Sequence, residues 1–400
     1  MSLRLSKTGI ASVFAYIVLL LLYMMILPYG DEPDFIARVP EYIIILENLN
    51  LSYYSDGITR VSDCKYLHNP LHTLGNYDFE SCVQSIEISL KRAFFTFVIY
   101  LPIVIISLSV RKLQNIQYSR FFNGYSLKNE AIKLSLVFPS FIYFSSLFSN
   151  EQVTLMLSIL FIYTLFRVKY IFAITLLIFI WIIDKGNASV VALICLYALG
   201  SIFIYRKAGF KVFFLLNFIA LLLAYILSTE VVYLLRDSGI LKNSIYLSGK
   251  ADQLIIGVEG YDVSERWPNW LRPVMTFMSY TFMPPALSKH LLLYLSIALG
   301  LISLLIKCAD KKNFQKIDKL YLVIPISVIS MIMIMLFILP GYNNAKYYIF
   351  TLPFLVNTLL YYFSFSKIII YFIFLNIIVL TDYLLFYAIG CSDCGTFYIG

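Results

Sequence analysis

The chain has 400 residues, of which 60% are hydrophobic and 14% charged, and its formal net charge is +8. This apolar content excludes an ordinary soluble fold. The positive charge does not indicate nucleic-acid binding, because the Lys and Arg residues concentrate in short loops on one predicted side of a membrane.

Apolar runs of about 18 or more residues recur along the chain, each long enough to cross a bilayer core as a helix. These runs are too long for the strands of a membrane barrel, and they lack the alternation of apolar and polar residues that such strands show. We therefore predict an all-α polytopic membrane protein, with residues 1–400 forming a single membrane-embedded domain. The predicted transmembrane helices, about 11 in all, are residues 9–28, 93–110, 131–148, 151–166, 169–184, 188–205, 211–233, 289–307, 320–339, 345–363 and 367–388.

The first run has some features of a signal peptide. However, it is about 20 residues long, against roughly 7–15 for the apolar region of a signal peptide, and no small-residue cleavage site follows it. We interpret it as a retained membrane anchor.

The charges of the loops predict the orientation. Every short loop that is cytoplasmic when the N-terminus is cytoplasmic carries Lys or Arg, whereas the short loops on the other side are nearly balanced. The positive-inside rule then places the C-terminus in the periplasm. Two long periplasmic loops follow, residues 29–92 and 234–288. We expect interfacial helices in them, since residues 35–49 are apolar with interspersed Glu and the second loop contains Trp267 and Trp270.

The cysteines are consistent with this map. Cys64 and Cys82 share the first long loop, and Cys391 and Cys394 share the C-terminal tail. A disulfide in either pair suits an oxidising compartment. The tail pair could also be half of a metal site, although two cysteines alone do not make a zinc site.

An acidic cluster directly follows the first span. Asp31, Glu32 and Asp34 lie at the predicted membrane boundary, where ionisable groups are costly and are functional candidates. We predict Asp31 or Glu32 as a catalytic general base. Asp34 is a candidate for substrate binding, or alternatively for capping a helix that begins near Pro33. A divalent metal beside the three carboxylates is compatible with the sequence, but nothing in the sequence requires one.

Other polar residues lie at the same predicted face, because short loops bring these helix ends together. Cations there can bind a phosphate, Arg in bidentate fashion and Lys as a point charge. Each residue also has a structural alternative: a solvated turn for Glu151, snorkelling to the interface for Lys185, and pairing with acidic residues of the same loop for the arginines. The predicted substrate-binding residues besides Asp34 are Glu151, Asp184, Lys185, Arg236, Arg266, Arg272, His290, Lys346 and Tyr347. Carboxylates facing such cations suggest transfer of a group from a lipid phosphate to a hydroxyl.

Placed on this topology, four short motifs resemble the GT-C superfamily of membrane glycosyltransferases. Residues 30–34 are similar to its first-loop acidic motif, and residues 145–152 to the turn between helices 3 and 4, where many members have a second acidic residue. Residues 184–186 resemble a Lys-Gly turn before helix 6. Residues 346–353 resemble an Arg-Tyr-x-x-x-x-x-Pro helix start, with Lys346 in place of the usual Arg.

Two alternatives accompany this resemblance. The O-antigen and capsule repeat-unit polymerases are also rich in aromatic residues, and residues 272–285 are most similar to them. The large first loop favours GT-C. A lipid or polysaccharide transporter, or flippase, is the alternative from another class. Such proteins usually show internal repeats and charged or broken helices in mid-membrane, whereas the predicted spans here are nearly free of charge.

The resemblance implies an integral glycosyltransferase of the bacterial inner membrane. It would move a sugar or oligosaccharide from a polyprenyl-phosphate or -diphosphate carrier to a hydroxyl acceptor on the periplasmic face, during assembly of O-antigen, capsule or another surface polysaccharide. Its expected partners are the lipid-linked sugar donor, a glycan or lipid-linked glycan acceptor and membrane lipids, with no nucleic acid. The sequence does not identify the sugar or the linkage, and it does not distinguish the addition of one sugar from the polymerisation of repeat units.

Overall fold

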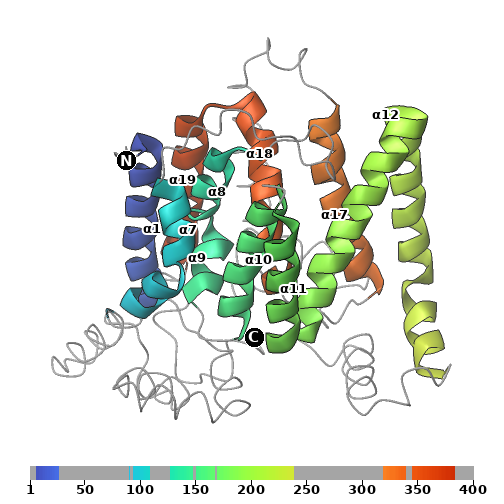
Figure 1. The fold of residues 1–400 in the computed structure, drawn as a ribbon, viewed down its shortest axis with the longest axis horizontal. Helices are drawn as coiled ribbons and strands as arrows, with labels where there is room; N and C mark the ends of the chain where they lie inside the picture. Colours follow the sequence, from blue (N-terminus) through green and yellow to red (C-terminus); the bar gives the residue numbers. More distant parts are fainter. Residues whose placement is uncertain are drawn as a thin grey trace.

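A computed structural model describes residues 6–26, 90, 93–108, 127–146, 150–166, 169–237, 319–338 and 345–382. Its elements within these ranges are all helices, so the predicted all-helical class is confirmed for this part of the chain (Figure 1). The predicted span 289–307, most of both long loops and the four cysteines proposed to pair lie outside the described residues. The helices are α1 (Lys7–Ile26), α7 (Leu101–Leu108), α8 (Asn129–Ser135), α9 (Pro139–Ser146), α10 (Asn150–Phe166), α11 (Tyr170–Ile183), α12 (Lys185–Asp237), α17 (Leu320–Ile338), the 3₁₀ helix η2 (Ala345–Thr351), α18 (Leu352–Tyr362) and α19 (Phe365–Asp382).

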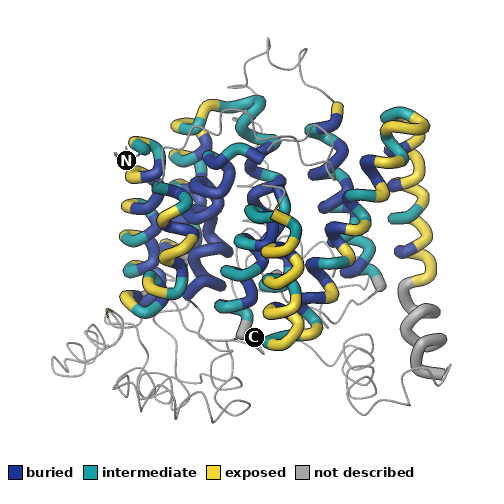
Figure 2. The backbone as a smooth tube through the Cα atoms, in the orientation of Figure 1, coloured by how far each residue is buried: buried dark blue, intermediate teal, exposed yellow. Residues whose placement is uncertain are grey.

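Three helical stretches among the described residues are long and apolar enough to cross a membrane: Lys7–Met24, Lys185–Leu227 and Leu320–Phe337. The shorter helices α10, α11 and α19 are also apolar. Large apolar side chains remain exposed on the outer sides of α11 and α12, for example Ile171 at 81% (Figure 2). Helices that are apolar on their outer as well as their inner faces are typical of membrane spans.

The helices cross the bundle in both directions, and most of their ends lie in two layers (Figure 1). The ends of α1, α9 and α11 and the starts of α10 and α12 lie in the lower layer in this view. The described charged residues of the upper layer are almost all basic: Lys7, Lys128, Lys133, Lys169, Arg206, Lys207, Lys211, Lys319 and Lys367, with Glu130 as the acidic residue. That the basic layer is cytoplasmic stays a prediction from the loop charges.

The predicted span 131–148 is interrupted. Pro139 has no backbone N–H, and the chain between α8 and α9 forms the tighter bonds Val137 N–H to Leu134 O (3.0 Å) and Phe138 N–H to Ser135 O (3.2 Å). The Val137 carbonyl instead accepts a 2.8 Å hydrogen bond from Asn376 Nδ2 of α19. The sequence pattern predicted one continuous helix here, and the break is the main departure from it.

The Asn376 amide belongs to a buried polar cluster. Its Oδ1 accepts a 2.7 Å hydrogen bond from the Tyr23 hydroxyl of α1, and its Nδ2 also donates to the Phe372 carbonyl at 2.7 Å. The side chains of Tyr23 and Asn376 are completely buried. The break between α8 and α9 is therefore compensated by a side chain from a distant part of the chain, as a buried carbonyl requires.

α12 is two helices joined at Gly209. Gly209 has φ 85° and ψ 173°, a conformation that residues with a side chain rarely adopt, and the ribbon reverses direction there (Figure 1). The two halves correspond to the predicted spans 188–205 and 211–233, and the hydrogen bond from Tyr197 OH to Asn217 Oδ1 (2.8 Å) joins them. α17 packs along this hairpin, where the rings of Tyr225 and Phe337 lie 5.4 Å apart.

α1 and α7 approach closely at the basic end of the bundle. A Cβ atom added to Gly9 would lie 2.2 Å from the Ser107 carbonyl oxygen, and the Ser6 amide donates to the Leu108 carbonyl at 3.1 Å. Small residues at such contacts let two backbones come together, which is a usual way of packing membrane helices.

Candidate functional site

An ion pair joins two of the residues that the sequence predicted for the site. Lys346 Nζ lies 2.7 Å from Glu151 Oε1, and the two side chains are only 10% and 15% exposed. Glu151 is in the first turn of α10, and Lys346 is in η2. The pair lies where α10 begins, in the less basic layer of helix ends.

The local sequence explains why Lys346 is held at this point. Pro353 lies in the first turn of α18, and the chain before it forms the 3₁₀ helix η2 instead of extending the α-helix. The Thr351 hydroxyl donates to the Tyr348 carbonyl at 2.6 Å, which tightens this segment. Ile349 and Phe350 are buried, so the sequence that follows Lys346 is anchored in the core.

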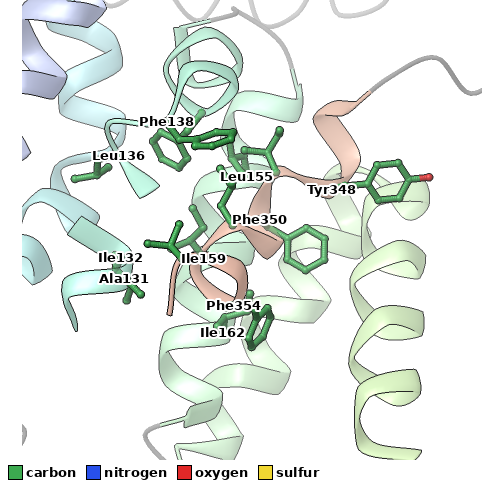
Figure 3. Packing of buried hydrophobic residues seen from close by; sticks show 14 of the residues in the cluster. Ala131, Ile132, Leu136, Phe138, Leu155, Ile159, Ile162, Tyr348, Phe350 and Phe354 are labelled. Atoms are coloured by element: carbon green, nitrogen blue, oxygen red, sulfur yellow. The ribbon is translucent and has the colours of Figure 1, made fainter. Parts of the chain in front are cut away.

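Packing against α10 fixes the register between the two elements. Phe350 and Phe354 lie beside Leu155, Ile159 and Ile162 of α10 (Figure 3). Further along, the rings of Phe166 and Phe354 are 5.6 Å apart. Because η2 and the first turn of α18 run alongside α10 in the same direction, the start of η2 meets the start of α10, and Lys346 meets Glu151.

Glu151 also benefits from its position in α10. The first turn of a helix presents unpaired N–H groups and the positive end of the helix dipole, which together favour a carboxylate. The Lys346 ammonium adds a full positive charge on the other side. Tyr347 lies next to it, with its ring centroid 5.5 Å from Lys346 Nζ, within the range of a cation–π contact.

Asp184 lies in the same layer, at the junction of α11 and α12, where it caps α12. Its Oδ1 accepts a hydrogen bond from the Asn187 backbone N–H at 3.1 Å, and its Oδ2 accepts one from Asn187 Nδ2 at 2.9 Å. Lys185 beside it is exposed. The capping contacts account for an Asp at this position, and substrate binding by Asp184 and Lys185 stays a prediction.

Several predicted site residues lie outside the part of the chain that the structure describes. The backbone of Arg236 is helical, at the end of α12. The remaining residues, the catalytic candidates included, lie beyond the described ranges: Asp31, Glu32, Asp34, Arg266, Arg272 and His290. The described residues contain no group of three His, Cys, Asp or Glu side chains that could hold a metal ion.

Sequence reasoning did not single out Gln152, which follows Glu151. Its side chain is almost fully buried and hydrogen-bonded to neighbouring helices. The sequence does contain a signal for Gln152, a polar amide at the start of an otherwise apolar helix. Such a group is costly to bury without hydrogen-bond partners, so its presence there indicates that partners exist.

No protein-family model, curated protein or solved structure matches this chain.

Proposed function

We propose that the protein is an integral-membrane glycosyltransferase that uses a polyprenyl-phosphate or -diphosphate sugar as donor. The supporting observation is the contact of Glu151 with Lys346. The sequence had selected both of these charged residues, which lie in distant parts of the chain. They meet in the layer of helix ends that also contains the end of α1, and Asp31 and Glu32 follow α1 in the sequence.

The ion pair can serve an anionic donor. In this proposal Lys346 binds the donor phosphate, together with arginines of the second long loop, while the polyprenyl tail lies among the helices. Before the donor binds, Glu151 compensates the ammonium charge, which would otherwise be costly in so buried a position. The diphosphate of a polyprenyl-diphosphate sugar carries two charges and competes with the single carboxylate for this cation. In a polyprenyl-phosphate donor the phosphate carries one charge, and its second charge develops as the sugar leaves.

The reaction is a single displacement. Asp31 or Glu32 takes the proton of the acceptor hydroxyl, whose oxygen forms a bond to the anomeric carbon as the bond between that carbon and the phosphate oxygen breaks. The bonding electrons leave with the lipid phosphate, and Lys346 stabilises the negative charge that develops on it. A single displacement inverts the anomeric centre.

The proposal can be tested with Lys346→Met and Lys346→Arg in the bacterium that carries this gene. The surface polysaccharide of each strain is analysed on gels beside a deletion strain and the wild type, at matched protein levels in the inner membrane. We expect Lys346→Met to reproduce the deletion and Lys346→Arg, which keeps the charge, to retain most glycan. Normal glycan in Lys346→Met, or in the deletion, would count against the proposal.

The gel also separates transfer from polymerisation. A deletion that removes the ladder of repeat lengths indicates a repeat-unit polymerase. A deletion that keeps the ladder but changes the composition of the glycan indicates a transferase that adds a sugar or branch.

A transporter remains the second candidate, because the break between α8 and α9 is a feature that favours it. Interrupted helices inside a bundle often line the substrate site of transporters. Purified protein in vesicles, supplied with a radiolabelled polyprenyl-phosphate sugar, distinguishes the two: movement of intact lipid between leaflets indicates transport, and release of polyprenyl phosphate with label on an acceptor indicates transfer.

A further inference from the structure

Gln152 connects the beginning of α10 to two neighbouring segments. Its Nε2 donates a 2.7 Å hydrogen bond to the carbonyl of Ser145, in the last turn of α9, and lies 3.2 Å from Thr96 Oγ1, to which it also donates. The Gln152 side chain is 1% exposed, and Thr96 and Ser145 are completely buried. One amide group therefore satisfies a carbonyl at a helix end and links α10 to residues 93–99.

The backbone of the same residue is held as well. The Tyr100 hydroxyl donates to the Gln152 carbonyl at 2.8 Å. The Ser145 hydroxyl is 3.1 Å from the Tyr16 hydroxyl of α1, so the cluster extends to a further helix. The first turn of a helix is otherwise the part most easily frayed, because its N–H groups lack partners within the helix.

Glu151 and Gln152 point to different sides of α10, since successive helical residues are rotated by about 100°. Gln152 faces α9 and residues 93–99, and Glu151 faces Lys346 in η2. We propose that Gln152 is a positioning residue, which fixes the rotation of this turn so that the Glu151 carboxylate stays on the Lys346 ammonium. Its relevance to catalysis rests on the proposed function, whereas the positioning itself does not.

The reactivity of the Lys346 amine measures the positioning directly. The full chain in lipid nanodiscs is treated with a limiting amount of an N-hydroxysuccinimide acetate, and acetylation of each lysine is quantified by mass spectrometry. Exposed Lys185 in the same layer is the internal reference. The variant is Gln152→Leu, which keeps the approximate volume and removes the amide.

Asn376→Leu is the matched control. Like Gln152, Asn376 is a buried amide whose nitrogen donates to a carbonyl of another segment, that of Val137 between α8 and α9, at 2.8 Å. Its loss should destabilise the bundle by a similar amount without touching the beginning of α10. Thr96→Val removes one hydrogen bond of Gln152 and provides a milder variant in case Gln152→Leu is not produced in folded form.

We expect Gln152→Leu, which removes two buried hydrogen bonds from the turn, to raise the acetylation of Lys346 relative to Lys185 by about tenfold. Thr96→Val removes one of them and should raise it by about threefold. Asn376→Leu should change the ratio by less than about twofold, because its hydrogen bonds lie elsewhere. Equal increases in Gln152→Leu and Asn376→Leu would overturn the proposal, because Gln152 would then only stabilise the bundle. An unchanged ratio in both Gln152 and Thr96 variants would overturn it too.

This measurement involves no sugar. If Lys346→Met leaves the surface polysaccharide normal while Gln152→Leu increases Lys346 acetylation, the proposed function fails and the positioning role stands. If the reverse is found, the proposed function stands and the positioning role fails.

Discussion

Replacing one member of the Glu151–Lys346 pair should destabilise the protein far more than replacing both. At 2.7 Å the attraction of the two charges is about 6 kcal/mol for an effective dielectric constant of about 20, before the loss of hydration is counted. Removal of one partner of a buried pair typically costs about 3–5 kcal/mol, because the other charge stays buried.

The structure indicates a somewhat smaller value for Lys346→Met. The side chains keep 10% and 15% exposure, and the dipole of α10 still favours the remaining Glu151 carboxylate. We therefore expect a loss of about 2–3 kcal/mol. The double replacement Glu151→Leu with Lys346→Met leaves no charge behind, and it should cost no more than about 1 kcal/mol.

Thermal unfolding of the purified variants in one detergent measures this difference. For a chain of this size, a loss of 2–3 kcal/mol corresponds to a decrease of roughly 2–4 °C in Tm. Lys185→Met serves as the control because Lys185 is exposed, and its effect should lie within about 0.5 kcal/mol. If the double variant is as destabilised as the sum of the two single variants, the two side chains do not stabilise one another and the reasoning is refuted.

Two further predictions concern the helix contacts. Gly9→Ala should lower Tm, because its Cβ would lie 2.2 Å from the Ser107 carbonyl and α1 must move, whereas Gly200→Ala, which meets no atom within 4 Å, should leave Tm unchanged or raise it; equal Tm values for both would contradict the close approach. Asp184→Ala should cost about 1 kcal/mol through loss of the cap on Asn187 N–H, and Asp184→Asn much less, as measured by the same unfolding assay. Full loss in Asp184→Asn would contradict capping, and altered surface glycan in a stable Asp184→Asn would support its predicted role in substrate binding.

The positions of the helices were largely predictable from local sequence. An apolar run has to satisfy its own backbone N–H and C=O groups, and a helix does so within the segment itself. The predicted spans therefore agree with α1, α10, α11, both halves of α12, α17 and α19 to within a few residues at most ends. Gly209 separates two helices at the point where the pattern had already placed a boundary.

The interruption between α8 and α9 was less predictable. Pro139 is visible in the sequence, but a proline inside an apolar run is compatible with a kinked continuous helix. Whether the helix breaks depends on a partner for the freed carbonyl of Val137. That partner is Asn376, in α19, and no local pattern connects the two residues.

For the candidate site too, one part was predictable from the sequence and another was not. The sequence alone identified Glu151 and Lys346 as charged residues at the starts of two helices on the same predicted face, because charges avoid an apolar environment and therefore mark helix ends. Only the tertiary structure decided that these two ends are neighbours, with Lys346 Nζ 2.7 Å from Glu151 Oε1, and that Gln152 is anchored beside them. Hydropathy determines where a chain enters and leaves an apolar layer, whereas adjacency depends on how side chains of separate helices pack together.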